Sequence, residues 1–575
     1  MDLKTFFEQF DTIAEAPGGI QRLRNLILDM AVRGKLVPQD PDDEPAVNLL
    51  HRIQIQKQKL IEVGEVPKPN KIKTEKNELE HLFDLPEKWT WTCLDTVSSY
   101  IQRGKSPKYA DSGKVLVISQ KCIQWTGFEL DKSRHIEDET ISSYGKERFL
   151  QPGDLLWNST GTGTVGRINV FPNNLIAQKV VADSHVTVIR SIECLPIFLY
   201  YWLSSPCIQS AIEDKTSGTT KQQELNTSTV RLEPVPLPPL AEQKRIVAKV
   251  DELMGLCDQF EAEKQQRDSL RQRLRASAFD ALMNAPTDDA LSTAWSFIHQ
   301  HWHPLTQHPD DVKDVRRSLL QLAVRGRLSY QEDNDGHAQD HLKAMIQEKV
   351  QLIKEKRIRA TKALADLDLE SMPFKLPKNW SWAYIQDVGE VKLGRQRSPK
   401  NHSGAHMVPY LRVANVLENQ LNLSDVKTMN FSPEEQEIFR LQKFDILLNE
   451  GQSYELVGRP AMYRDEIPGA CFQNTLVRFR AFSQLMPDYA LLVFRGYMHN
   501  GRFQDKAQQT TNIAHLSVGR LLNIEFPLPP LAEQKRIVAK VDELMRECDQ
   551  LEAQLRQQQQ VAEQFAASAV SHLVV

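Results

Sequence analysis

The sequence predicts an α+β fold with a pseudo-two-fold internal repeat, in which two globular α+β domains are separated by long helices that form an antiparallel coiled coil. The first observation is an identical run of nineteen residues, PLPPLAEQKRIVAKVDELM, at Pro236–Met254 and again at Pro527–Met545. The second is the heptad pattern in each run and beyond it, and the third is the strand-like texture of two long segments elsewhere in the chain. The second run begins 291 residues after the first, about half of the 575-residue chain, so we infer an internal duplication.

Each nineteen-residue run begins with prolines that favour an extended strap and then enters a helix. Apolar residues in the helix alternate at spacings of four and three, which is the pattern of a coiled-coil seam. The seam of the second copy is broken only by Gln558, and that of the first copy by Lys264, Arg267 and Arg271. The other seam positions are Ile246, Val250, Leu253, Cys257, Phe260, Leu274 and Ala278 in the first copy, and Ile537, Val541, Leu544, Cys548, Leu551, Leu555, Ala562, Phe565 and Ala569 in the second. We expect the two helices to pair with each other, unevenly where the first seam is broken.

Composition restricts the possible classes of protein. Hydrophobic residues make up 41% of the chain and charged residues 25%, as in a soluble globular protein, and the formal net charge is −4. No overall basic excess indicates nucleic acid, although a positive groove can coexist with acidic helices elsewhere. The seven cysteines are scattered without a C-x-x-C pair, which argues against a disulfide framework and a cysteine-type zinc site. Without an apolar signal core or a run of eighteen apolar residues, the sequence predicts a cytoplasmic protein.

Further repeats divide the chain into domains. LRNLILDMAVRGKL at Leu23–Leu36 matches VRRSLLQLAVRGRL at Val315–Leu328, with Gly34 as a predicted helix stop, and LPEKWTW at Leu85–Trp91 matches LPKNWSW at Leu376–Trp382. The predicted order is a helical region at 1–84, a globular domain at 85–239, a central helical region at 240–375, a second globular domain at 376–530 and a final coil helix at 531–575. The central region comprises a long coil helix (240–284), a connector (285–311) and a second helix pair (312–370).

Both globular domains combine short strand-like runs with Gly, Asn and Pro punctuation. The predicted strands include VLVIS (115–119), DLLWNST (154–160), HVTVIR (185–190) and TLVRFR (475–480), and the predicted closing helices are 197–212 and 489–503. The domains match each other only at fixed points, among them SPK, VGR, Asp154 with Asp445, and Asn158 with Asn449. Divergent domains suggest two different ligands read with the same fold, whereas near-identical helices suggest one scaffold or one partner docked twice.

Motifs of catalysis are sparse. The run GTGTVG at Gly161–Gly166 is formally a dinucleotide-binding pattern, but a strand-like run follows it where such a site needs a helix, so we interpret it as a hairpin turn. His299, His301, His303 and His308 cluster, yet the helical spacing of nearby apolar residues spreads them around a helix, so no metal site is predicted. We find no phosphate loop, no H-E-x-x-H and no N-P-P-[FY] or D-P-P-[FY] tetrapeptide, and we assign no catalytic residue.

Binding features occur at matched positions in both globular domains. A Gly/Pro loop carries Arg, Lys and Ser, which can bind phosphates and guanine edges. A second segment is rich in Thr, Gln and Asn, which can bond adenine or backbone, and polar residues follow a strand end in each domain. The candidate DNA-binding residues are Arg103, Lys105, Ser106, Lys108, Tyr109, Asn158, Ser159, Thr160, Thr219, Thr220 and Lys221 in the first domain, and Arg395, Arg397, Ser398, Lys400, Asn449, Gln452, Tyr454, Thr510, Thr511 and Asn512 in the second.

Together these features resemble the specificity subunit of Type I DNA restriction–modification enzymes. The resemblance rests on the two nineteen-residue blocks, the CDQ after each block (Cys257–Gln259 and Cys548–Gln550) and the two AVRG helices, and it covers essentially the whole chain. It implies that each globular domain is a target recognition domain reading one half of a split DNA site, and that the helices dock two modification subunits. The candidate docking residues are Glu242, Gln243, Arg245, Glu533, Gln534 and Arg536.

The resemblance also implies a non-catalytic role. Modification subunits would hold S-adenosylmethionine and methylate adenine at N6, and restriction subunits would add ATP-driven translocation and Mg²⁺-dependent nuclease activity. This chain is then expected to bind double-stranded DNA but no cofactor or metal of its own. Two alternatives from other classes stay open: a self-contained DNA methyltransferase or nuclease with an unrecognised site, and a coiled-coil adaptor that binds only proteins.

Overall fold

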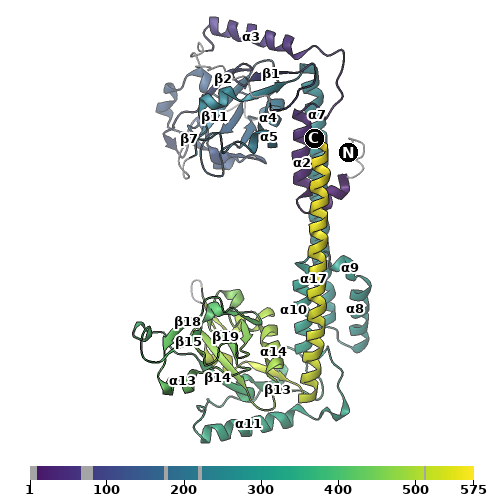
Figure 1. The fold of residues 1–575 in the computed structure, drawn as a ribbon, viewed down its shortest axis with the longest axis vertical. Coiled ribbons are helices and arrows are strands. Elements are labelled where there is room, and N and C mark those ends of the chain that lie inside the picture. Colours follow the sequence, from purple (N-terminus) through teal and green to yellow (C-terminus); the bar gives the residue numbers. More distant parts are fainter. Residues whose placement is uncertain (1–9, 67–81, 174–178, 218–222, 510–512, 575) are drawn as a thin grey trace. The chain divides into compact units, whose positions relative to one another are not determined.

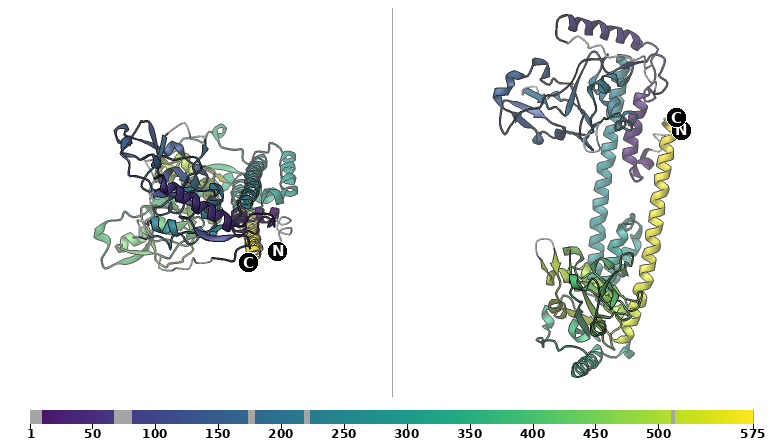
Figure 2. Two further views of the ribbon diagram at one scale, coloured as in Figure 1. Left: turned by 90° about the horizontal axis from the view of Figure 1, so that it is seen from above. Right: turned by 60° about the vertical axis from the view of Figure 1, so that its left-hand side comes forward.

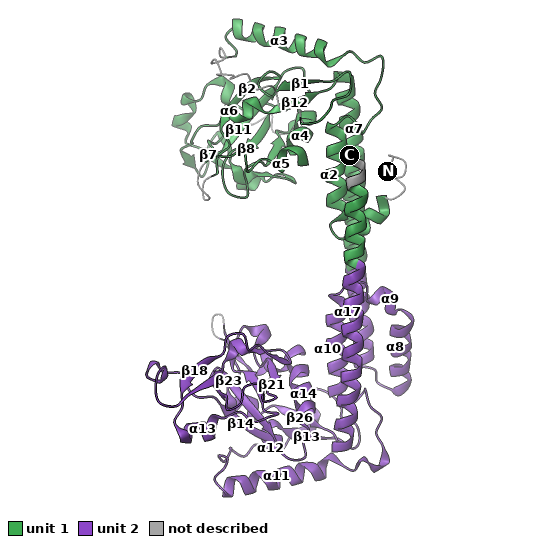
Figure 3. Ribbon diagram, viewed as in Figure 1, with its two compact units in different colours: residues 1–268, 559–575 green, residues 269–558 purple. Residues whose placement is uncertain are grey.

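The structure is a computed structural model that describes residues 10–66, 82–173, 179–217, 223–509 and 513–574. The chain divides into two compact units, unit 1 with residues 1–268 and 559–575, and unit 2 with residues 269–558 (Figure 3). Each unit contains one globular α+β domain, which we call lobe 1 (85–239) or lobe 2 (376–530), and a set of helices. The α+β class and the internal repeat predicted from the sequence are therefore confirmed.

Lobe 1, which contains the strands labelled β2 and β11 in Figure 1, is built around a four-stranded antiparallel sheet in the order β2-β11-β8-β9. Its strands are β2 (Ser98–Arg103), β11 (Val186–Ser191), β8 (Leu155–Asn158) and β9 (Ile168–Val170). All four residues of β8 are buried, because both of its faces are covered. A second sheet has the order β10-β4-β7-β3, with β10 parallel to β4. Its strands are β10 (Lys179–Ala182), β4 (Val115–Ile118), β7 (Arg134–Ile136) and β3 (Tyr109–Ala110), and a small hairpin joins β5 (Ile123–Gln124) to β6 (Gly127–Phe128).

Lobe 2 repeats this topology with different residues. Its central sheet has the order β14-β23-β19-β21, and its second sheet the order β18-β15-β22 with β15 parallel to β22. The strands are β14 (Gly389–Leu393), β23 (Leu476–Ala481), β19 (Ile446–Asn449), β21 (Pro460–Met462), β18 (Lys427–Asn430), β15 (Met407–Leu411) and β22 (Cys471–Phe472). The equivalent hairpin joins β16 (Val416–Leu417) to β17 (Gln420–Leu421). Lobe 2 also has a small sheet of β20 (Gly451–Gln452), β25 (Ala514–His515) and β24 (Gln508–Gln509), where lobe 1 has the isolated bridges of Glu224 with Thr160 and Ser217.

The proline-rich straps are extended, as predicted, and each closes its lobe. β12 (Pro234–Leu237) pairs antiparallel with β1 (Thr90–Cys93), so that Pro236 lies opposite Trp91. In lobe 2, β26 (Glu525–Leu528) pairs with β13 (Ser381–Tyr384), and Pro527 lies opposite Trp382. Proline fits in these two-stranded sheets because an edge strand does not need every backbone N–H for pairing.

The predicted closing helices of the lobes are shorter than expected. The segment 197–212 forms α4 (Pro196–Ser204) and α5 (Pro206–Gln209), because Pro206 disfavours the helical conformation at the residue before it. The segment 489–503 is likewise interrupted between α14 (Pro487–His499) and α15 (Arg502–Lys506), where Gly501 has a positive φ of 85°. The remaining short helices of the lobes are α6 (Thr227–Leu232), α12 (Ile385–Val388), α13 (Pro433–Phe439) and α16 (Val518–Leu522).

The two predicted coil helices are long and uninterrupted. α7 (Leu240–Met283) and α17 (Leu531–Val574) have 44 residues each. Figure 2 shows them as continuous helices, α7 in teal and α17 in yellow. Unit 1 contains the start of α7 and the end of α17, and unit 2 contains the end of α7 and the start of α17. The other helices are α2 (Gly19–Val32) and α3 (Ala46–Glu62) in unit 1, and α8 (Asp288–Gln300), α9 (Trp302–Leu305), α10 (Asp311–Val324) and α11 (Ala338–Lys354) in unit 2. No helix among the described residues is long and apolar enough to cross a membrane.

The same ion pairs hold the helices of each unit. In unit 1, Arg24 of α2 lies 2.6 Å from Asp258 and 2.8 Å from Glu261 of α7. In unit 2, Arg316 of α10 makes the equivalent pairs with the carboxylates of α17 at 2.6 and 2.5 Å. The start of α7 therefore contacts α2 as the start of α17 contacts α10.

The order of contacts in unit 2 gives the helix directions. Arg275 of α7 lies beside the start of α10, and Arg325, just after α10, donates to Met283 O at the end of α7, so these two helices run parallel. Arg316 near the start of α10 contacts Glu552, whereas Ser329 after α10 contacts Glu533, so α10 and α17 run antiparallel. The parts of α7 and α17 in unit 2 are consequently antiparallel.

The polar break in the first seam has a partner outside the coil. Lys264 donates to the backbone oxygen of Glu15 at 2.9 Å, and Arg267 donates to the Glu15 carboxylate at 2.7 Å. Glu15 belongs to the helical turn at residues 10–15, which precedes α2. At the position of Lys264, α17 has Leu555, which is buried in an apolar cluster with Leu305. The two seams differ because they meet different preceding segments.

The AVRG motif ends its helix at a glycine that also contacts the lobe. Gly34 and Gly326 have φ values of 68° and 69°, the left-handed conformation that favours glycine after a helix. A Cβ atom at Gly34 would lie 2.6 Å from Pro86 Cγ and 3.0 Å from the Trp89 ring. Gly326 is equally close to the proline and tryptophan of the second LP-x-x-W motif. The predicted helix stop is confirmed, and its glycine also lets the helical region approach the lobe.

We expect Gly34→Ala and Gly326→Ala each to lower the free energy of unfolding by about 2 kcal/mol or more. The strain of an L-residue at positive φ contributes about 1 kcal/mol, and the clash with proline and tryptophan adds to it. Urea denaturation of the full chain measures the effect. Gly64 is a matched control, because it has a φ of 79° but open space around it. Gly64→Ala should therefore cost only about 1 kcal/mol, and equal losses at all three positions would contradict the packing role.

Candidate nucleic-acid interface

The loops predicted to bind DNA in lobe 1 meet at one edge of its central sheet. β2 and β8 end at this edge and β11 begins there, since Thr187 of β11 lies opposite Arg103 on one side and Trp157 on the other. The hydroxyl groups of Ser106 and Ser184, from two different loops, lie 3.0 Å apart. Three segments that are distant in the sequence thus form one continuous surface of lobe 1, which we call edge 1.

Several candidate residues at edge 1 hold the loops together. Arg103 pairs with Glu224 and donates to the backbone oxygen of Ser159 at 3.3 Å. Asn158 and Ser159 are fully buried, and Asn158 Nδ2 donates to the backbone oxygen of Gln120 at 3.1 Å. Their side chains shape edge 1 without being exposed on it.

Two further candidates are half-buried and bonded to neighbouring loops. Lys105 Nζ donates to Ser143 Oγ at 2.8 Å and lies over the ring of Tyr144. Thr160 Oγ1 lies 2.6 Å from His185 Nδ1. These contacts hold the side chains of Lys105 and Thr160 in place, so a ligand would contact them in the orientation seen here.

The exposed candidates at edge 1 are Ser106, Lys108 and Tyr109. Lys108 has no ion pair or side-chain hydrogen bond within the described part of the chain. The Tyr109 hydroxyl lies 3.4 Å from Asp183, and the guanidinium of Arg134 lies 4.6 Å from its ring centroid. Burial, with Asp183 nearby, raises the pKa of Tyr109 to about 12, so its phenol stays a neutral donor. Sequence reasoning missed Arg134, because neither a repeated motif nor a loop signal marks it.

In lobe 2 the candidate loops meet at the equivalent edge of the central sheet, edge 2. β14 and β19 end there and β23 begins, with Leu393 opposite Val477 and Asn449 opposite Leu476. β20, which contains Gln452, follows β19 in the chain and pairs with β25, which contains His515. The two lobes therefore place their candidate loops at the same structural position.

Arg395 corrects a prediction made from its loop. Its guanidinium makes two contacts of 2.8 Å with Glu435, donates to the backbone oxygen of Asn430 and lies 4.7 Å from the Phe431 ring centroid. Only 13% of its side chain is exposed. Arg395 therefore holds the loop against β18 and α13 instead of presenting a free cation, and the sequence pattern could not distinguish it from Arg397.

The exposed candidates at edge 2 are Arg397, Lys400 and Tyr454, whereas Ser398 and Gln452 are half-buried. Arg397 Nε lies 3.1 Å from His402 Nε2, and Tyr454 is 45% exposed. Lys400 has no ion pair or side-chain hydrogen bond within the residues that the structure describes. Edge 2 thus presents two cations and an aromatic ring, as edge 1 presents Lys108, Tyr109 and Arg134.

The fixed points shared by the lobes are structural. Asp154 and Asp445 are buried and pair with Arg190 and Arg480 at 2.7 and 2.6 Å. Burial raises the pKa of Asp154, and the bonded arginine opposes that shift. Asn449 is also fully buried, with neither side-chain polar atom hydrogen-bonded within the described residues. These positions keep the same letters because they build the sheet below the loops.

Six candidate residues lie outside the described residues: Thr219, Thr220, Lys221, Thr510, Thr511 and Asn512. The described residues that flank each group lie beside the edge, since Ser217 pairs with Glu224 in lobe 1 and β24 pairs with β25 in lobe 2. Their assignment stays a prediction.

The candidate docking glutamates bond the lobes to the long helices within each unit. Glu242 is buried and accepts hydrogen bonds from Trp89 Nε1 at 3.0 Å and from Gln39 at 2.6 Å. Glu533 is fully buried and accepts from Trp380 Nε1 at 2.8 Å and from a serine hydroxyl at 2.9 Å. Burial raises the pKa of both carboxyl groups, and the indole hydrogen bonds oppose the shift. A partner subunit cannot reach these two side chains at the surface.

The neighbouring candidates of the docking block have similar partners. Gln243 and Gln534 are fully buried, and each accepts a hydrogen bond from the backbone N–H at the start of a lobe helix, at 3.0 and 2.7 Å. Arg245 pairs with Asp43 and Arg536 with Asp335, which lowers the pKa of both aspartates. The structure therefore gives the two glutamates and two glutamines a role in joining lobe and helix, whereas Arg245 and Arg536 bond the long helix to the segments before α3 and α11.

The motifs that looked catalytic have structural explanations. GTGTVG forms the turn between the antiparallel strands β8 and β9, with positive φ at Gly161, Gly163 and Gly166, so the hairpin interpretation is confirmed. The histidine cluster spans α8, α9 and the turn that follows, and no group of three or more metal-ligating side chains occurs in the described segments. The first motif is therefore a hairpin turn, and the histidines lie on helices and the adjoining turns, as their spacing indicated.

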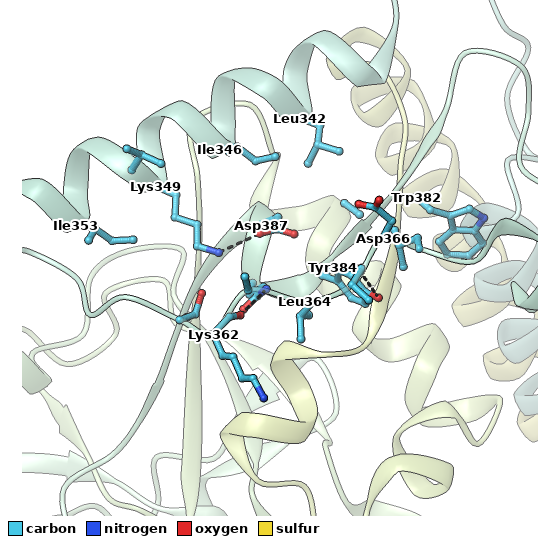
Figure 4. Close-up of a pocket in the computed structure, with 17 residues that line it drawn as sticks. Leu342, Ile346, Lys349, Ile353, Lys362, Leu364, Asp366, Trp382, Tyr384 and Asp387 are labelled. Carbon is cyan, nitrogen blue, oxygen red and sulfur yellow. Dashed lines mark hydrogen bonds and ion pairs between the residues drawn. The ribbon is translucent and has the colours of Figure 1, made fainter.

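Unit 2 also contains a pocket of about 430 Å³ between α11, β13 and residues 361–367 (Figure 4). Lys349 and Asp387 pair across it at 2.9 Å, and the Tyr384 hydroxyl donates to the Ala365 oxygen at 3.2 Å. None of the predicted DNA-binding residues lines this pocket. Its main charges neutralise each other, which leaves edge 2 as the candidate site of the lobe.

We expect Arg395→Ala to destabilise lobe 2 by about 2 kcal/mol, because it removes charge-assisted hydrogen bonds and leaves Glu435 unpaired. Arg397→Ala, two residues away and exposed, should leave stability within about 0.5 kcal/mol of the unmodified chain. Urea denaturation of the two full-length variants measures the difference. Equal stability of the two variants would show that Arg395 does not hold the loop.

Comparison with known proteins agrees with this architecture. The family model described as Type I restriction modification DNA specificity domain matches residues 86–267 and again 377–559. The chain is 29% identical to the Type I restriction enzyme EcoAI specificity subunit of Escherichia coli over 93% of this chain and 90% of that protein. It is 28% identical to the EcoEI specificity subunit of Escherichia coli over 94% and 92% of the two chains.

Among solved structures, the chain is similar to the HsdS subunit from Thermoanaerobacter tengcongensis, with 19% identity and a TM-score of 0.40 over 85% of this chain and 99% of that one. The two family matches together cover more than half of the chain, and each contains one lobe except its first residue, with the start of the helix after it. The chain therefore belongs to the Type I restriction–modification specificity subunit family, with one DNA specificity domain in each half.

Proposed function

We propose that each lobe reads one half of an asymmetric, bipartite double-stranded DNA target through edge 1 or edge 2. The observation that carries this proposal is that the same strand ends support different exposed side chains in the two lobes. The shared sheet holds the loops of both lobes in the same position relative to DNA, whereas the different loop side chains determine which bases are contacted. Because the loops share few letters, the two half-sites should have different sequences.

The chemistry of the exposed side chains suits DNA. Lys108, Arg397 and Lys400 are exposed cations that can bind phosphate, and arginine can also bind the guanine edge in the major groove. Tyr109 and Tyr454 add exposed rings and hydroxyl donors beside them. A net charge of −4 for the whole chain does not oppose this proposal, since local cations act within a Debye length of about 8–10 Å.

We expect Lys108→Ala to weaken binding to the first half-site only and Lys400→Ala to weaken binding to the second only. Each change removes at most one phosphate contact, so the slope of log K against log salt should fall by about 1. The measurement is a gel shift at several salt concentrations with the full chain in complex with its modification partner. Probes with one half-site randomised at a time identify the half that is affected.

Lys443 provides the matched control for these variants. It is exposed, but it precedes β19, at the end of that strand away from edge 2. Lys443→Ala should leave both half-sites unchanged. If the three lysine variants weaken binding to either half-site alike, the contacts are nonspecific and the assignment of one edge to one half-site is wrong.

We further propose that the helices dock two modification subunits for adenine N6 methylation, and restriction subunits for cleavage. Since Glu242, Gln243 and their equivalents are buried, docking falls on the outward face of the repeated block. This face presents the exposed side chains Lys244, Ala248 and Glu252, with Lys535, Ala539 and Glu543 at the same positions of α17. Two copies of one face can bind two copies of one partner.

The catalytic steps belong to those partners in this proposal. S-adenosylmethionine, ATP and Mg²⁺ bind to the modification and restriction subunits, and this chain supplies the DNA sequence information and the docking faces. The buried carboxylates near the lobes support this division, since Asp154, Asp445, Glu242 and Glu533 are all engaged in contacts that hold the fold.

We expect the purified chain alone to transfer no methyl group from radiolabelled S-adenosylmethionine to DNA, and the complex with the modification subunit to methylate adenine. The two samples differ only in the partner, so the comparison tests where the chemistry resides. Methyl transfer by the isolated chain would instead favour a self-contained methyltransferase. Binding of the partner without any DNA affinity would favour a protein adaptor.

A further inference from the structure

The two units share one helix contact but differ in the helix that completes it. The start of α7 packs on α2 in unit 1 through the same ion pairs by which the start of α17 packs on α10 in unit 2. The end of α17 (559–574) completes unit 1, and the end of α7 (269–283) completes unit 2. Since the contact residues are of the same type in both units, this shared contact cannot decide which helix end belongs to which unit.

In unit 2, a buried arginine anchors the end of α7. Arg275 of α7 is only 7% exposed. Its guanidinium lies 2.8 Å from Asp311 and 3.0 Å from Asp314, both in the first turn of α10, and donates to the Leu305 backbone oxygen at 3.4 Å. A buried guanidinium needs such partners, because an unpaired charge in the protein interior is strongly destabilising.

Unit 1 has none of these partners at the equivalent positions. With the offset of 291 residues, Arg275 corresponds to Ala566, which is fully buried in the unit 1 core. α2 and α10 both have 14 residues, so Asp311 corresponds to Gly19 and Asp314 to Arg22. Gly19 cannot be replaced by an acid, since a Cβ atom there would lie 1.7 Å from the Ile13 oxygen.

The end of α7 has a second anchor in unit 2. Arg325 donates to the Met283 oxygen at 2.9 Å, and Arg327 donates to the Ala285 oxygen at 2.8 Å. These guanidinium groups satisfy carbonyl groups at the end of the helix, where cations also interact favourably with the helix dipole. In unit 1 the residue equivalent to Arg325 is Arg33, and it pairs with Asp29 of its own helix at 2.9 Å.

We propose that the ion pairs of Arg275 with Asp311 and Asp314 determine where the end of α7 packs. They stabilise this helix end in unit 2, and their loss would destabilise it in unit 1. In unit 1 an arginine at this position would be buried where the equivalents of the two aspartates are Gly19 and Arg22. The end of α17 carries alanine at this position and fits there without a charge. Because of these ion pairs, the ends of α7 and α17 are not interchangeable, although the blocks that precede them are identical. Two copies of the chain therefore cannot freely exchange these helix ends with each other.

The direct test uses two full-length chimeras in which residues 268–283 replace residues 559–574. The first chimera keeps the transplanted arginine at position 566, and the second restores Ala566 at that single position. We expect the first to lower the thermal unfolding midpoint by about 10 °C, as a buried unpaired charge would, and the second to recover most of that loss. Hydrogen exchange of α2 locates the change in unit 1. Equal midpoints for the two chimeras would overturn the proposal.

Point variants of the full chain supply an independent comparison. A566R should reproduce the loss, and A566R/R22D should recover at least half of it, because the new carboxylate takes the place that Asp314 has in unit 2. A566R/R22A removes the like charge without supplying an acid and should recover less. The exposed neighbour gives the control A567R, which should have no effect. If A566R does not accumulate as folded protein, recovery of soluble chain by R22D but not by R22A is the expected result. Equal recovery by R22A and R22D would overturn the role of the acid.

Discussion

In both units, a buried hydrogen bond between a tryptophan indole and a glutamate joins the lobe to the long helix. Trp89 donates to Glu242 in unit 1, and Trp380 donates to Glu533 in unit 2. Burial raises the pKa of both glutamates, so the indole hydrogen bond is part of what makes their position tolerable. The other contacts of the junction depend on this one, because the tryptophan that donates it is also the surface against which Gly34 or Gly326 packs.

This junction explains why the strap, the helix start and the AVRG motif repeat together. The strap strand pairs beside the tryptophan, the helix that follows it presents the glutamate and glutamine, and the glycine ends the helix that covers the indole. A change in any one of these elements would alter the contacts of the others. The elements therefore form one structural module, in which nine of the nineteen identical residues are buried in each unit.

In the lobes, equivalent buried residues are kept, but the exposed residues at edges 1 and 2 differ. The buried pairs Asp154–Arg190 and Asp445–Arg480 hold equivalent strands, whereas the exposed side chains above them are unlike. Matched polar letters in a loop were therefore a poor guide to exposure. Arg395 and Arg397 occupy the same loop, yet one is held by Glu435 and the other is exposed, because only one of them lies beside a carboxylate that a distant segment brings near.

The sequence by itself determined the repeat, the α+β class, the extended straps, the long helices and the absence of the common cofactor motifs. These features depend on local periodicity, on proline and on glycine, which act within a few residues. Only the tertiary structure decided which candidates are exposed and what the polar break in the first seam meets. It also showed that the docking candidates Glu242 and Gln243 face the lobe and that Arg275 has two aspartates as partners. Those answers depend on contacts between residues tens to hundreds of positions apart, such as Lys264 with Glu15 and Arg245 with Asp43, and no local pattern encodes such a pair.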